Sequence, residues 1–156
     1  MAAQQTRFVG IYEHGLDEKG RMVLPSKIRA LLGETGMVGM LDGCLGLWTL
    51  EGFDAIADDF ATRVEAQEAP MRDFRVFMAY AAEVTPDQQG RVVIPQRLRD
   101  YAKLGSEVVV SGRRDRAEIW DRAAWDELAH SAIDGPATSD EEADADLAST
   151  MAALRL

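Results

Sequence analysis

The chain has 156 residues, of which 47% are apolar and 28% charged, with a formal net charge of −10. This length suits one domain or two small ones, and the composition is typical of a soluble globular protein. With no apolar run near the ~18 residues of a membrane helix, no secretion signal and only one cysteine, Cys44, we expect a cytoplasmic protein without disulfides.

The negative charge is distributed unevenly along the chain. Residues 117–156 carry ten acids and two bases, and residues 49–71 carry six acids and one base. Residues 7–48 are balanced at five of each, and residues 72–116 carry nine bases against six acids. Because salt screens charges beyond ~10 Å, the net charge does not exclude a local basic site.

The first half of the chain is predicted to alternate short strands with helices. The expected turn begins with Asp17, whose side chain can accept from backbone amides, and Gly20 supplies a positive φ. Pro25 suits the first turn of a helix and Gly33 suits its end. In chain order we expect a strand at 7–16, a tight turn at 17–20, a strand at 21–25, a helix at 25–33, two strands within 37–50 and a helix at 51–67.

The second half is predicted to repeat this order. Its first segment, 75–84, is strand-like but compatible with a helix, since periodicity alone does not separate the two. The last segment, 135–156, is acidic and rich in small residues, so we expect it to be mostly disordered, with a weak helical tip at 146–156. Between them we expect a turn at 87–90, a strand at 91–95, a helix at 95–105, two strands within 107–120 and a helix at 122–133.

The repeat is clearest in one nine-residue motif. "DEKGRMVLP" at 17–25 returns as "DQQGRVVIP" at 87–95, with Asp, Gly, Arg, Val and Pro at identical spacing. Farther on, Trp48 corresponds to Trp120 at an offset of seventy-two residues. A slip of two residues between matched blocks indicates a loop insertion. We therefore predict a first repeat at 7–70, a second at 71–133 and an acidic tail at 134–156.

The duplicated motif resembles the MraZ family of bacterial transcription regulators, which is similar to the AbrB-like DNA-binding proteins. The resemblance implies an α+β fold of two tandem AbrB-like swapped-hairpin half-barrels with short helices, each followed by a longer packing helix. It also implies a ring-shaped homo-oligomer without cofactors that binds short direct repeats in promoter DNA. Such a protein would be nucleoid-associated and would repress its own promoter and the adjacent division and cell-wall genes.

The resemblance assigns DNA contact to the arginine of each motif, Arg21 and Arg91. The planar fork of arginine suits both phosphates and guanine edges, although each arginine could instead hold a structural salt bridge. Lys19 and Lys27 add positive charge near the first motif, and Gln89 replaces Lys19 in the second. We predict DNA contacts by Arg21, Lys19, Arg91, Gln89 and Lys27, and turn-forming roles for Asp17, Gly20, Asp87 and Gly90.

Other conspicuous residues have plainer interpretations. Trp48, Trp120 and Trp125 are expected to pack in the core or between subunits, and His14 is expected to be an ordinary surface or turn residue. Arg29 and Arg99, just behind the motifs, favour a structural or interface role. Arg113, Arg114 and Arg116 are expected to form a solvated loop, with a subunit or DNA contact as the alternative.

The sequence does not favour an enzyme. Cys44 has no sequence-adjacent base, and the only histidines are His14 and His130. One Cys and two His without clustered spacing do not predict a metal site. The alternative to DNA binding is an oligomerisation module whose acidic surface docks a basic protein. For the DNA-binding interpretation, we expect the acidic tail and helix 51–67 to suppress indiscriminate binding.

Overall fold

The computed structural model describes residues 7–135 and 146–154. The chain divides into two compact units, Met1–Asp121 and Arg122–Leu156. The disorder predicted for the tail falls largely on residues 136–145, which lie outside the described residues. The domain boundaries predicted from the repeat remain a prediction.

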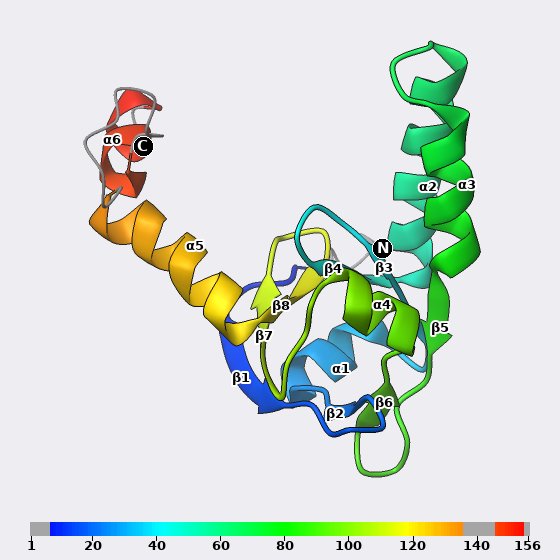
Figure 1. Ribbon diagram of the computed structural model, residues 1–156, viewed down its shortest axis with the longest axis vertical. Coiled ribbons are helices and arrows are strands. Elements are labelled where there is room, and N and C mark those ends of the chain that lie inside the picture. The colour runs from blue at the N-terminus through cyan, green and yellow to red at the C-terminus, as the bar shows by residue number, and fades with distance from the viewer. Residues whose placement is uncertain (1–6, 136–145, 155–156) are drawn as a thin grey trace, which may run out of the picture. The chain divides into compact units, whose positions relative to one another are not determined.

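The first unit is a mixture of short helices and antiparallel strands, which confirms the predicted α+β class. Its strands and helices, coloured from blue to yellow in Figure 1, are β1 (Ile11–Gly15), β2 (Arg21–Val23), α1 (Ser26–Leu32), β3 (Gly36–Met40), β4 (Leu45–Thr49), α2 (Leu50–Glu65), α3 (Met71–Tyr80), β5 (Ala82–Val84), β6 (Arg91–Val93), α4 (Gln96–Tyr101), β7 (Glu107–Gly112) and β8 (Ala117–Asp121).

The strands of the two repeats are interleaved in one six-stranded sheet of order β1-β7-β8-β4-β3-β5. The first strand of each repeat pairs with a strand of the other: β1 with β7, and β5 with β3. The centre of the sheet joins β4 to the equivalent β8. A separate two-stranded ribbon pairs β2 with β6. Each repeat thus contributes its first strand to its partner, which is the swapped arrangement.

Side chains from the ribbon, the two short helices and the sheet together form one hydrophobic core. Both repeats contribute to it equally: Met22 and Val92 come from the ribbon, and Ile28 and Leu98 come from α1 and α4. Each of these four side chains is at most 2% exposed. Burial stabilises the folded chain by roughly 25 cal/mol per Å² of apolar surface removed from water. The ribbon is therefore held by packing as well as by its backbone hydrogen bonds.

The segment 75–84 is a helix over most of its length, so the strand interpretation was wrong there. Helix α3 spans Met71–Tyr80, and only Ala82–Val84 forms a strand. Pro70 precedes the first turn of the helix, and Phe74 and Phe77 are placed on one face by their spacing of three residues. Phe60 of α2 packs against both, with ring centroids 5.3 and 5.6 Å away. This contact with α2 decides a choice that local periodicity leaves open.

Helix α2 begins at Leu50, one residue before the predicted start. The Thr49 hydroxyl accepts a hydrogen bond of 2.9 Å from the Gly52 backbone N–H, which caps the helix. Trp48, just before this cap, is 1% exposed and meets Phe53 edge to face at 5.6 Å. The prediction that Trp48 is a packing residue is therefore confirmed.

The second unit contains α5 (Arg122–Asp134) and α6 (Leu147–Ala153). Helix α5 matches the predicted helix at 122–133, and α6 lies within the predicted helical tip, capped by the side chain of Asp146. Trp125 of α5 is partly buried. Across the described ranges, no helix combines the length and the apolar character needed to cross a bilayer.

Candidate nucleic-acid interface

The first motif forms a tight loop that is closed by the Asp17 side chain. One carboxylate oxygen accepts hydrogen bonds of 2.9 Å from the backbone N–H groups of Lys19 and Arg21. The backbone N–H of Gly20 donates to the Asp17 carbonyl at 3.0 Å, and Gly20 has a φ of 79°. Asp17 thus holds the loop in the shape that only a glycine at position 20 adopts without strain.

The second motif has the same geometry. Asp87 accepts from the backbone N–H groups of Gln89 and Arg91 at 2.8 and 2.9 Å, and Gly90 has a φ of 78°. Both loops lie beside the ribbon of β2 and β6, at the end of the unit away from the α2–α3 hairpin (Figure 1). The repeat in sequence is therefore a repeat in backbone geometry.

Each motif arginine is anchored by the aspartate of its own loop. Nε of Arg21 lies 2.8 Å from Asp17 Oδ2, and Nε of Arg91 lies 2.9 Å from Asp87 Oδ2. The arginine side chains are 41% and 40% exposed. The anchoring hydrogen bond uses only Nε, and the terminal guanidinium nitrogens make no hydrogen bond to the residues that the structure describes. From the sequence, a structural salt bridge and a DNA contact are alternative roles for each arginine, and this geometry is compatible with both.

The loop hydrogen bonds favour the ionised form of both aspartates. The backbone N–H of Arg21, with its side chain and the backbone N–H of Lys19, lowers the pKa of Asp17 against an opposing effect of desolvation. The same groups of Arg91 and Gln89 lower the pKa of Asp87. Hydrogen bonding to the charged form of a carboxylate has this effect generally. Each loop therefore keeps a carboxylate beside its arginine at neutral pH.

Each loop is braced by the opposite repeat. The Leu24 N–H donates to the Gly90 carbonyl at 2.9 Å, and the Ile94 N–H donates to the Gly20 carbonyl at 2.7 Å. The guanidinium of Arg99, on α4, donates to the carbonyls of Ile94 at 2.9 Å and Glu18 at 3.4 Å. Neither loop is therefore an independent unit.

Arg29 occupies the equivalent place in the other repeat. A Cβ built on Gly90 would collide with its guanidinium, as a Cβ on Gly20 would with Arg99. Arg99 thus has the structural role expected of it, and Arg29 packs against the second loop. No local pattern in the sequence reveals this bracing, because Arg99 and Glu18 are 81 positions apart.

The remaining predicted contact residues occupy different surroundings. Lys19 and Gln89 are exposed at the loop tips, and Lys27 is exposed in the first turn of α1. The residue equivalent to Lys27 is Arg97, whose guanidinium instead lies 5.0 Å from the ring centroid of Tyr80. Positive charge beside the loops is therefore greater in the first repeat than in the second.

Two arginines of the basic turn at 113–116 form ion pairs with acidic residues close by in the sequence. Arg113 pairs with Asp115 at 3.1 Å, and Arg116 pairs with Glu118 at 3.1 Å. Arg116 is also placed over Trp48, 5.8 Å from its ring centroid. These contacts favour a structural role for this turn. His14 is a half-buried residue near the end of β1, opposite Val108.

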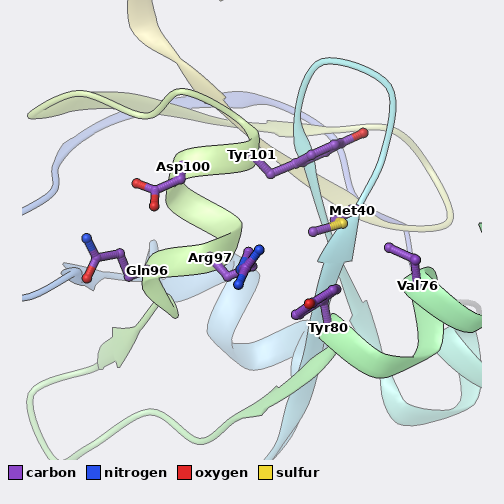
Figure 2. A pocket seen from close by; sticks show the side chains of 7 residues that line it. All are labelled: Met40, Val76, Tyr80, Gln96, Arg97, Asp100 and Tyr101. Carbon is purple, nitrogen blue, oxygen red and sulfur yellow. The ribbon is translucent and has the colours of Figure 1, made fainter.

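Two surface hollows differ in the residues that line them. A hollow of about 320 Å³ lies against the ribbon and is lined by Arg21, Val23 and Arg91 among others. A larger one, of about 710 Å³, lies between α3 and α4 (Figure 2). There the Tyr101 hydroxyl donates to the Leu41 carbonyl at 2.6 Å and Arg97 stacks on Tyr80. Only the first hollow brings the repeated arginines together.

Cys44 does not have the surroundings of a nucleophile. Its side chain is 1% exposed, and burial, together with the charge of Glu118, raises the pKa of the thiol to about 12. Reactive cysteines have lowered pKa values and are accessible. The thiol is therefore protonated at neutral pH and packs as a small apolar group.

Comparison with known families places this geometry in context. A family model described as "MraZ protein, putative antitoxin-like" matches residues 8–75 and 77–147. Each matched segment contains one Asp-x-x-Gly-Arg loop, and together they cover most of the chain. The family is one of transcription regulators rather than enzymes. The chain therefore belongs to the MraZ family, with one family domain over each repeat.

Proposed function

We propose that the protein is a sequence-specific DNA-binding transcription regulator that contacts DNA through its two Asp-x-x-Gly-Arg loops. The observation that carries the proposal is the duplicated presentation of Arg21 and Arg91, both anchored through Nε while their side chains are 41% and 40% exposed, respectively. A guanidinium held in this way loses little conformational entropy on binding and can make two parallel hydrogen bonds to a guanine edge or a phosphate.

The finer parts of the proposal concern the assembly and its target. The protein forms a ring-shaped homo-oligomer on short direct repeats of promoter DNA, and represses its own promoter and the neighbouring division and cell-wall genes. One loop makes few contacts, so high affinity requires several subunits that engage repeats at matching spacing. Family membership supports this part of the proposal.

The test is a fluorescence anisotropy titration with a labelled fragment from upstream of the protein's own gene, beside a scrambled fragment, across a salt series. We expect selective binding that weakens with salt, because neutralised phosphates release counterions. Arg21→Ala should lower the affinity at least tenfold, since each subunit loses a charged contact worth roughly 1.5–3 kcal/mol.

Arg63→Ala is the matched control. Arg63 also forms an Nε salt bridge with an aspartate four residues earlier, Asp59, at 3.0 Å, but lies on α2. It removes the same charge and the same type of salt bridge away from the loops, so affinity should be unchanged. Equally weakened binding in both variants would show that net charge alone governs binding. A well-folded wild-type oligomer that ignores genomic DNA would favour the protein-docking alternative.

A further inference from the structure

The outer face of the β2–β6 ribbon carries two arginines and two valines. The strands pair antiparallel, with Arg21 opposite Val93 and Val23 opposite Arg91. The central pair, Met22 and Val92, points into the core, and both residues are 2% exposed. Because side chains alternate along a strand, the four flanking residues share the outer face. Each arginine therefore has a valine directly across the ribbon.

Both valines have large exposed fractions, although burial in the core is the usual structural role of valine. Val23 is 43% and Val93 is 56% exposed. A β-branched residue suits a strand, and a single exposed valine requires no explanation. Here, however, the exposed apolar residue occurs at both equivalent positions, each directly opposite a motif arginine. Val23 also lines the 320 Å³ hollow together with Arg21 and Arg91.

The chemistry of the DNA major groove matches this face. The groove admits a two-stranded β-ribbon, and arginine pairs with the N7 and O6 acceptors of guanine. Thymine is the base that presents an apolar group there, its C5-methyl, which apolar side chains contact. A ribbon face on which valines alternate with arginines is therefore complementary to thymines next to guanines.

We infer that Val23 and Val93 contact thymine C5-methyl groups and determine specificity at positions next to the guanines read by Arg21 and Arg91. This inference rests on the proposed DNA-binding function and adds to it a second class of base contact. The arginines supply charge and hydrogen bonds, and the valines favour thymine over cytosine and purines through contact with its C5-methyl group.

The experiment replaces single thymines by deoxyuridine, which lacks only the C5-methyl group. A duplex is first selected by the full-length protein from a random-sequence pool, and every thymine in it is then replaced in turn. Affinities are measured for wild type, Val23→Ala, Val93→Ala and the control Val9→Ala, which removes the same atoms from a valine that is 71% exposed and outside the ribbon. Circular dichroism melting verifies that each variant is folded.

For wild type and Val9→Ala, we expect deoxyuridine at one or more thymines next to guanine to lower the affinity. The loss should be about fourfold for each thymine C5-methyl group that no longer contacts a valine. The same replacements should have no further effect in the ribbon variant that lacks the matching valine. This non-additivity identifies a direct contact between the methyl group and the side chain.

Three results would overturn the inference. They are a selected duplex without thymine beside guanine, a wild-type protein indifferent to deoxyuridine, and a deoxyuridine effect that persists in both ribbon variants. If selection succeeds and binding depends on Arg21 while any of these holds, the valine contact is wrong and the DNA-binding function stands. If no sequence is enriched and Arg21→Ala changes nothing, both proposals fail together.

Discussion

Gly20 has a φ of 79°, and a Cβ atom there would lie 2.6 Å from the Ile94 carbonyl oxygen. That oxygen belongs to backbone of the other repeat, so it cannot move away without disturbing the ribbon. Gly33 has almost the same φ, 78°, but a Cβ atom there would meet nothing within 4 Å. The two glycines therefore separate conformational strain from a steric collision.

We expect Gly33→Ala to lower the free energy of unfolding by about 1–3 kcal/mol, because a φ of 78° with a ψ of −150° is a strained backbone conformation for any residue other than glycine. Gly20→Ala should cost roughly 1–3 kcal/mol more, because the Cβ atom overfills a closed space. Urea unfolding followed by circular dichroism measures both values. Equal destabilisation by the two substitutions would mean that the loop yields to the Cβ atom and that the Ile94 contact is unimportant.

Cys44 gives a second prediction at this scale. Because burial raises the pKa of its thiol from 9.0 to about 12, the native protein should react with Ellman's reagent far more slowly than the urea-unfolded chain. Stability linked to this thiol is fully present below pH 9 and is lost as the pH rises towards 12, since the unfolded thiol ionises first. Equally rapid labelling of native and unfolded protein at pH 8 would contradict the buried placement.

At the scale of elements, helix α4 positions a loop of the opposite repeat through Arg99. We expect Arg99→Ala to weaken binding of the selected DNA about fivefold, because loss of its hydrogen bonds to Ile94 and Glu18, roughly 1 kcal/mol in total, loosens the first loop. If Arg99 acts through Arg21, the double variant Arg21→Ala/Arg99→Ala should bind no worse than Arg21→Ala alone.

Arg97→Ala is the control for this cycle. It removes the same charge from the same helix, but its guanidinium stacks on Tyr80 rather than on a loop. Affinity should therefore change little. Additive effects of the Arg21 and Arg99 substitutions would show that Arg99 contacts DNA itself or acts only through overall charge.

Local sequence signals predicted most elements but not the contacts that join them. The two Asp-x-x-Gly turns were readable because Asp and Gly at those positions have a defined backbone chemistry. Segment 75–84 was not, because its helical form depends on the packing of Phe74 and Phe77 against Phe60. The alternation of Met22 and Val92 with Val23 and Val93 could have identified the outward valines, whereas the bracing by Arg99 had no local signal.

At the scale of the whole molecule, charge is separated along the chain. Residues 134–146 contain six acids and no base, whereas 72–116 carry a net +3 from nine bases and six acids. Replacing Asp140, Glu141, Glu142 and Asp144 by their amides changes the formal net charge from −10 to −6. The variant keeps the length of the chain.

We expect this variant to bind scrambled DNA several-fold more tightly than wild type at 50 mM salt, because less like charge opposes the phosphates. The difference should disappear near 0.5 M salt, where the screening length is only a few ångströms. Anisotropy titrations with the scrambled and the selected duplex measure the ratio of the two affinities. An unchanged affinity for scrambled DNA at low salt would exclude a role for these acids in specificity.

The interleaving of the repeats was implied by the resemblance to the MraZ family and not by periodicity. Alternation along β1 or β5 indicates that a strand exists, but the pairing partner is set by contacts distant in sequence. The same limit applied to Arg21 and Arg91, for which salt bridge and DNA contact were alternatives. The geometry makes the two compatible, because the hydrogen bond to the aspartate uses Nε and not the terminal nitrogens.

The exchange of first strands has a consequence for synthesis on the ribosome. Strand β1 pairs with β7, which ends at Gly112, about a hundred residues later in the chain. During translation, β1 and the edge of β4 that pairs with β8 must therefore remain unpaired until most of the second repeat has emerged. The first repeat cannot complete its sheet as a nascent chain. Two identical half-length chains could, in contrast, complete each other, which is the arrangement expected of an ancestor before its gene was duplicated and fused.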